Sequence, residues 1–173
     1  MSTPIFLSHP RPITNIQSGF IKELSHKLII TGFGPLTLGE NSYNIEAPLK
    51  GIIDLMDETY GLMTVALKRT RIDKGVYSPE TKDTKPISDK WLTSPYCQIE
   101  TAIGYKLDLP VLILRDKDVL EEGVLEKGVT GDYISTIDLS ESYDDYLNSK
   151  EFEGLLKKWE IKVMKQYVKR HKS

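Results

Sequence analysis

Residues 94–100, with the sequence Ser-Pro-Tyr-Cys-Gln-Ile-Glu, place a hydroxyl, a thiol and a carboxylate where a loop becomes a helix. Glu100 falls in the first turns of that helix, next to Ile99, so we expect its carboxylate to be partly shielded from water. A shielded carboxylate can bind a ribose diol and stabilise positive charge at the anomeric carbon while a sugar–nitrogen bond breaks. A glutamate near a helix start can also do no more than complement the helix dipole, so the residue types leave both interpretations open.

The composition is typical of one globular domain. The chain has 173 residues, of which 39% are hydrophobic, and its 23 basic and 25 acidic residues give a net charge of −2. This length suits a single core, and the charge balance argues against a dedicated nucleic-acid binder. Cys97 is the only cysteine, which excludes an intramolecular disulfide and fits a reducing compartment. Without a visible signal peptide or an apolar run near ~18 residues, we expect a cytoplasmic protein with no membrane partner.

Apolar runs and helical stripes alternate along the chain. Short apolar runs predict strands at residues 4–8, 33–38, 61–67, 110–114 and 133–137. Apolar residues spaced three and four apart predict helices at residues 14–28, 48–56, 96–107 and 151–169. Residues 39–47 and 116–130 are polar and are expected to be loops.

This order of elements predicts an α/β fold with helices on both faces of a parallel sheet. Right-handed crossovers favour a flavodoxin-like three-layer sandwich whose five-stranded parallel sheet has the order 2-1-3-4-5. Residues 69–91 interrupt the alternation, because they are rich in Lys, Asp, Thr, Pro and Ser. We expect a loop there, of a length that compact domains keep for functional or mobile segments.

The carboxyl ends of the predicted strands locate a candidate site. The first strand ends at Ser8 and His9, the third ends near Arg69, and the loop carrying Ser94 leads into the helix of Glu100. Open α/β sheets bind ligands at this edge. We therefore expect these five side chains to converge, although no local motif joins them.

Other reactive residue types have simpler interpretations. Cys97 has no histidine near it in sequence, so we expect a buried small side chain rather than a nucleophile. The three histidines, His9, His26 and His171, show no metal-ligand spacing with it, and no metal site is predicted. The lysine-rich segment 157–172 is expected to be a solvated face that complements the C-terminal helix dipole.

The pattern Ser94-x-Tyr96-Cys97-x-x-Glu100 resembles the signature of TIR domains, in which an aromatic–Cys pair precedes the helix that carries a glutamate. The opening strand, Ile-Phe-Leu-Ser-His at residues 5–9, is similar to the first strand of that family. The resemblance covers most of the chain in its order of elements, but only the block at 94–100 is specific. Nucleoside deoxyribosyltransferases are similar in fold and also use a helix glutamate.

The TIR resemblance implies a single TIR-like domain over residues 1–173, with a long polar insertion at 70–92 and a C-terminal helix at 147–173. It implies an NAD glycohydrolase or ADP-ribosyl cyclase that cleaves the nicotinamide–ribose bond. NAD would then be the substrate, and no cofactor would be needed. Some bacterial members of the family make cyclic ADP-ribose signals in antiviral defence.

By the same resemblance, Glu100 would be the catalytic carboxylate and Ser94 would line the ribose pocket. Ser8 and His9 would lie at its mouth. Arg69 and Tyr96 are the remaining substrate-binding candidates. Residues 38–47 would correspond to the segment that closes over the ligand in assembled TIR domains, although the Arg-Asp-x-x-Pro-Gly stretch of adaptor-type members is absent.

Three functions remain open at this point. The first is the NAD-cleaving enzyme, and the second is a non-catalytic TIR scaffold that self-associates. The third is a nucleoside or nucleotide hydrolase similar to the deoxyribosyltransferases. The expected partners are NAD or a related nucleotide, further copies of the chain and a separate effector protein, without nucleic acid.

Overall fold

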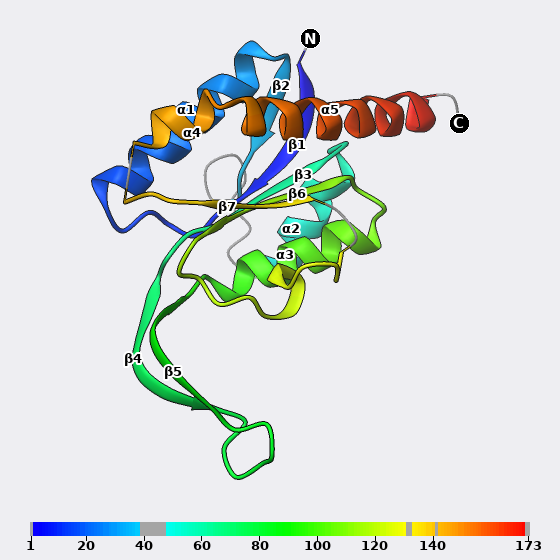
Figure 1. The fold of residues 1–173 in the computed structure, drawn as a ribbon. Coiled ribbons are helices and arrows are strands. Elements are labelled where there is room, and N and C mark those ends of the chain that lie inside the picture. The colour runs from blue at the N-terminus through cyan, green and yellow to red at the C-terminus, as the bar shows by residue number, and fades with distance from the viewer. Residues whose placement is uncertain (1, 39–47, 131–132, 141, 172–173) are drawn as a thin grey trace.

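Five parallel strands form the centre of the molecule, in the order β2-β1-β3-β6-β7 (Figure 1). The structure is a computed structural model that describes residues 2–38, 48–130, 133–140 and 142–171. The strands are β1 (Thr3–Ser8), β2 (Phe33–Leu36), β3 (Leu62–Ala66), β6 (Val111–Asp116) and β7 (Tyr133–Ile137). Numbered within the sheet alone, this order is 2-1-3-4-5, which confirms the predicted α/β fold and strand order.

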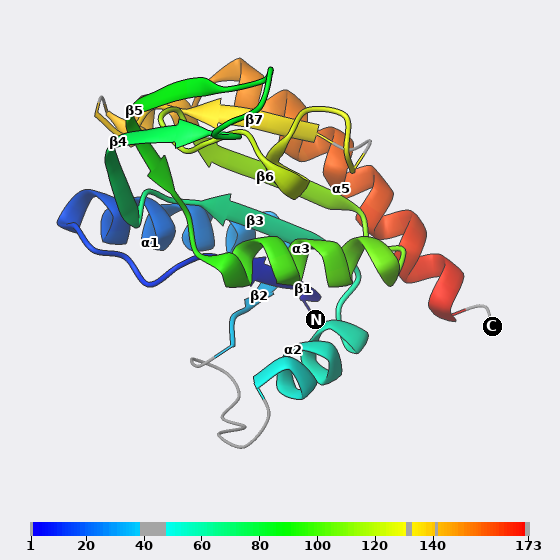
Figure 2. The same ribbon diagram turned by 90° about the horizontal axis from the view of Figure 1, so that it is seen from below.

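Helices cover both faces of the sheet (Figures 1 and 2). The helices α1, α4 and α5 lie on one face, and α2 and α3 lie on the other. Their bounds are α1 (Asn15–Ile30), α2 (Pro48–Asp57), α3 (Pro95–Lys106), α4 (Tyr143–Leu147) and α5 (Lys150–His171), with a 3₁₀ turn η1 (Gly123–Leu125). We did not predict α4, because five residues are too few to display a helical period.

Alternate residues of each strand enter two separate hydrophobic clusters. In β1, Ile5 and Leu7 pack among residues of α1 and α5, whereas Phe6 packs among residues of α2 and β6. Because both faces of the sheet are buried, the central strands β1, β3 and β6 are mostly apolar rather than alternating. Trp159 of α5 is fully buried, and its Nε1 donates to the carbonyl oxygen of Pro110 at 2.9 Å. This bond fixes α5 to the amino end of β6.

Our prediction of a loop at residues 69–91 is wrong. The segment forms an antiparallel hairpin of β4 (Thr70–Tyr77) and β5 (Lys85–Leu92), which projects from the body of the molecule (Figure 1). Most of its side chains are exposed, so the strands carry no apolar alternation from which they could be recognised. At the base, backbone hydrogen bonds join Trp91 to Asp118 and Leu120.

Two further expectations concern the rest of the chain. The polar loop expected at 39–47 lies outside the described residues, and it makes up all but the first residue of the segment 38–47 that was expected to close over a ligand. Among the helices that the structure describes, none has the length and apolar character needed to cross a membrane.

Candidate functional site

Ser94 determines where α3 begins. Its Oγ accepts a hydrogen bond from the backbone N–H of Tyr96 at 3.2 Å, which makes it the N-cap. Pro95 follows in the first helical turn, where its missing N–H costs nothing. Glu100 therefore lies about one and a half turns into the helix. It belongs to the buried stripe of α3 together with Cys97.

Close packing against β3 fixes the rotation of α3 about its axis. A Cβ atom at Gly104 would lie 2.5 Å from Cδ2 of Leu62, so a larger residue would force the Leu62 side chain to shift. One turn earlier, the hydroxyl of Thr101 lies 2.6 Å from that of Thr64 and donates to the carbonyl oxygen of Cys97 at 2.6 Å. These contacts direct the neighbouring Glu100 side chain towards the sheet.

Glu100 and Ser8 form the centre of the site. The Ser8 hydroxyl, on the last residue of β1, donates a hydrogen bond to Oε2 of Glu100. Ser8 is 1% exposed and Glu100 is 7% exposed. The two residues thus meet at the carboxyl edge of the sheet, as the topology predicts.

Burial changes the acidity of this carboxyl group. Desolvation raises the pKa of Glu100 from 4.5 to about 7, and the hydrogen bond from Ser8 opposes part of that rise. A carboxyl group with a pKa near neutral exchanges its proton within the physiological range, which is typical of catalytic acids and bases. The simple alternative of a solvated glutamate that only complements the helix dipole does not fit this burial.

Arg69 reaches the helix start from the base of the hairpin. Its Nη1 donates to Oγ of Ser94 at 3.1 Å, and its backbone N–H donates to the carbonyl oxygen of Leu92 at 3.0 Å. Ser94 therefore joins the hairpin to α3, beside the turn that leads to Glu100. The guanidinium belongs to an exposed residue, so it remains accessible to a ligand.

His9 and Tyr96 take more peripheral positions. His9 is half-buried, and its Nδ1 lies 2.9 Å from the carbonyl oxygen of Pro10. Because a carbonyl only accepts, this contact requires the proton on Nδ1. Tyr96 is 47% exposed and bonds to Ser94 through its backbone. Neither side chain has a hydrogen bond to Glu100 among the contacts that the structure describes.

Cys97 is a buried side chain, as predicted. Desolvation, together with the nearby charge of Glu100, raises the pKa of the Cys97 thiol to about 12. The neutral thiol is a poor nucleophile, which agrees with the prediction of a buried small side chain.

The sequence analysis missed a charged cluster beside the site. Lys68 Nζ lies 3.3 Å from Oδ1 of Asp116 and 2.7 Å from Oδ2 of Asp118. Burial is the main cause that raises the pKa of Asp116. Asp116 is the last residue of β6. It could therefore have been predicted in the same way as Ser8 and Arg69, from its place at the carboxyl end of a parallel strand. Within the described parts of the chain, no three His, Cys, Asp or Glu side chains gather in a way that could hold a metal ion.

Comparisons with known proteins support the fold. No protein-family description matches the sequence, and no curated protein matches it significantly. A CMP N-glycosidase from Clostridium botulinum, BcmB, is similar in structure, with a TM-score of 0.50 and 17% identity over 84% of this chain and 95% of that chain. A conserved protein from Enterococcus faecalis V583 has a TM-score of 0.44 and 12% identity over 85% and 96% of the two chains.

At such low identity, the likeness concerns the fold alone. The resemblance to TIR domains gains no support from these matches and stays a prediction. The chain shares an α/β fold with this CMP N-glycosidase. Its buried Glu100 carboxyl group lies at the carboxyl edge of the sheet, where open α/β sheets bind ligands.

Proposed function

We propose that this chain is an N-glycosidase that hydrolyses the bond between the ribose and the base of a nucleotide. The observation that carries this proposal is the buried Glu100 carboxyl group, held by Ser8 at the carboxyl edge of the sheet and carrying a pKa raised to about 7. The fold similarity to a CMP N-glycosidase supports a reaction of this class.

The chemistry requires Glu100 in its ionised form. When the bond from C1′ to the base nitrogen breaks, its electron pair leaves with the base, which takes up a proton, and positive charge develops at C1′. A carboxylate beside C1′ stabilises that charge. A water molecule then forms the new C1′–O bond and loses a proton. Ser8 holds Oε2, which fixes the direction in which the carboxylate faces the sugar.

Arg69 gives the site a means of selecting nucleotides over nucleosides. Its guanidinium is held at the helix start by Ser94, and a planar guanidinium matches the oxygens of a phosphate group. We propose that Arg69 binds the phosphate of the substrate while Glu100 faces the sugar. Replacing Arg69 by Ala should then raise KM for a nucleoside monophosphate and leave KM for the matching nucleoside nearly unchanged.

NAD is a second candidate substrate, favoured by the pattern of Ser94, Tyr96, Cys97 and Glu100 that resembles TIR domains. Its nicotinamide–ribose bond is also an N-glycosidic bond, so the same carboxylate would serve. In that case the product would be linear or cyclic ADP-ribose, and further copies of the chain would complete the site.

The test is incubation of the purified protein, at several concentrations, with CMP, cytidine, deoxyuridine, adenosine and NAD, followed by chromatography of the released bases. Glu100→Gln should abolish base release and leave the fold intact. Glu153→Gln, which changes an exposed glutamate of α5, should retain full activity. Base release by the wild type that Glu100→Gln does not reduce would contradict the proposal. Inactivity of both proteins on every substrate would instead favour a non-catalytic scaffold.

A further inference from the structure

Helix α5 has two apolar stripes on nearly opposite sides. One is buried in the core and consists of Phe152, Leu156, Trp159 and Val163. The other consists of Ile161, Met164 and Val168, which are 50%, 40% and 43% exposed. A helix at the surface of a protein normally has one apolar stripe, towards the core, and polar residues opposite. The core therefore does not account for the second stripe.

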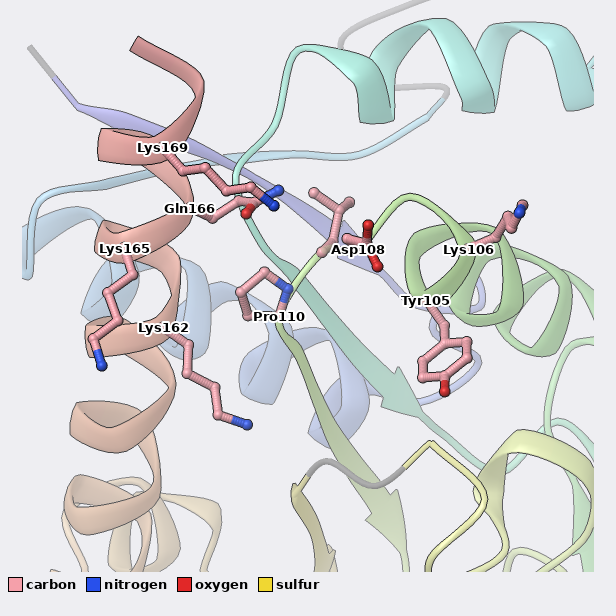
Figure 3. A pocket seen from close by; sticks show the side chains of 9 residues that line it. Tyr105, Lys106, Asp108, Pro110, Lys162, Lys165, Gln166 and Lys169 are labelled. Atoms are coloured by element: carbon pink, nitrogen blue, oxygen red, sulfur yellow. The ribbon is translucent and has the colours of Figure 1, made fainter. Parts of the chain in front are cut away.

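A shallow groove of about 640 Å³ runs along the exposed stripe. Its lining comes from α5 alone and comprises Lys157, Glu160, Ile161, Met164, Lys165 and Val168. Figure 3, which views the neighbouring side of α5, shows Lys165 directed away from the loop that carries Pro110. Neither Glu160 nor Lys165 has a side-chain hydrogen bond or ion pair within the described parts of the chain. Both charges are thus available to a partner that enters the groove.

The spacing of the stripe is that of a coiled-coil seam. Lys157, Ile161, Met164 and Val168 follow one another at intervals of four, three and four residues, which are the intervals between the a and d positions of a heptad. Ile161 and Val168 then take a positions, and Met164 takes a d position. β-Branched residues at a favour the pairing of two helices. A second amphipathic helix is therefore the shape that fits this surface.

The charges beside the seam select the partner and its direction. Glu160 takes the g position, and Lys165 takes the following e position. In a parallel pair, each g residue lies beside the next e residue of the other helix. Glu160 of each copy would therefore meet Lys165 of the other, and two ion pairs would form. An antiparallel pair would instead bring the e positions together, and with them Lys158 and Lys165. A parallel pair of identical α5 helices is thus complementary in charge.

We propose that two copies of this chain associate through parallel α5 helices, with the exposed stripe as the seam between them. This surface lies on the opposite face of the sheet from α3 and Glu100, and the proposal does not depend on the reaction there. The seam covers only residues 157–168, so the contact is smaller than the ~1,200–2,000 Å² of stable interfaces. We therefore expect a weak dimer, with a Kd in the micromolar range.

Sedimentation equilibrium of the full chain, at concentrations from about 5 to 500 μM, tests the proposal. The wild type should change from monomer to dimer over this range. Ile161→Asp should weaken dimerisation at least tenfold, because it places a carboxylate from each copy in the seam. The matched control Ile53→Asp changes an exposed isoleucine of α2, on the other face of the sheet, and should change it less than twofold. Glu100→Gln should dimerise as the wild type does.

Charge reversal distinguishes the parallel pair from other arrangements. Glu160→Lys and Lys165→Glu should each weaken dimerisation roughly tenfold, since two ion pairs become two repulsions. A mixture of these two variants should dimerise, because each supplies the charges that the other lacks. The double variant Glu160→Lys/Lys165→Glu should recover most of the affinity of the wild type. Circular dichroism and thermal melting establish that each variant is folded.

Several results would overturn the proposal. They are a wild type that stays monomeric over the whole concentration range, equal effects of Ile161→Asp and Ile53→Asp, and charge-reversed variants that do not complement each other. Cosedimentation of a monomeric wild type with phosphatidylserine vesicles would also overturn it, because the apolar stripe and its lysines would then bind a membrane surface.

Discussion

Glu100 should make the protein less stable as the pH rises. Its pKa is about 7 in the folded protein, against 4.5 for an unperturbed glutamate. Between these two values the folded state holds a proton that the unfolded state has released, so the free energy of unfolding falls with increasing pH. At about 1.4 kcal/mol per pKa unit, the loss approaches about 3 kcal/mol above pH 7.

Replacing Glu100 by Gln removes this effect and keeps the shape of the side chain. The variant should unfold at a similar urea concentration to the wild type near pH 4.5, where the carboxyl group is protonated in the folded state and still half protonated in the unfolded state. At pH 8.5 the variant should be the more stable protein, by about 3 kcal/mol. Urea denaturation at both values, followed by circular dichroism, measures the difference. Glu153→Gln serves as the control for replacing an exposed glutamate.

The pH dependence is the decisive part of this experiment. A gain in stability that is equal at both pH values would mean that the variant stabilises the protein for a reason unrelated to ionisation. A variant that is less stable than the wild type at pH 8.5 would show that the ionised carboxylate has favourable partners in the folded state. Either result would refute the assignment of a desolvated, destabilising carboxyl group, and with it the basis for the catalytic role.

The Ser8 hydrogen bond lowers the pKa of Glu100, so Ser8→Ala should move the rising limb of kcat/KM to higher pH; a pH–rate profile with an unmoved limb would contradict this. Gly104→Ala should lower the thermal midpoint, because its Cβ would lie 2.5 Å from a neighbouring side chain, and such overpacking costs about 1–3 kcal/mol. Gly154→Ala, in helix α5 with open space around it, should raise the thermal midpoint, because alanine favours a helix over glycine by about 1 kcal/mol. Ser94→Ala should cost about 1 kcal/mol in urea denaturation through loss of the α3 cap, and Ser94→Asp should restore most of it.

The sheet could be predicted from the sequence because its strands are buried on both faces. Runs such as those at 61–67 and 110–114 are almost continuously apolar, and the handedness of crossovers then limits the strand order. The hairpin at 70–92 could not be predicted in this way, because its strands are mostly exposed. Its strands are stabilised by backbone pairing while their side chains face solvent, so composition alone indicates a loop.

The sequence predicted which residues meet in the candidate site, but not the acidity of its carboxyl group. The edge rule brings Ser8 and Glu100 together, and the structure joins them by a hydrogen bond. The raised pKa of Glu100 depends on how completely the folded protein shields the carboxyl group from water. The spacing of residues along the chain does not reveal this.

The bond between Ser8 and Glu100 spans 92 positions of the chain, and this separation bears on folding. Contacts between distant positions form late, because the entropy of closing the intervening loop must first be overcome. A fragment that starts after β1 would contain the whole of α3 and yet lack the hydroxyl that binds its glutamate. The pairing of Ser8 with Glu100 is thus created by the meeting of the two segments, and it reports that the first strand has joined the sheet.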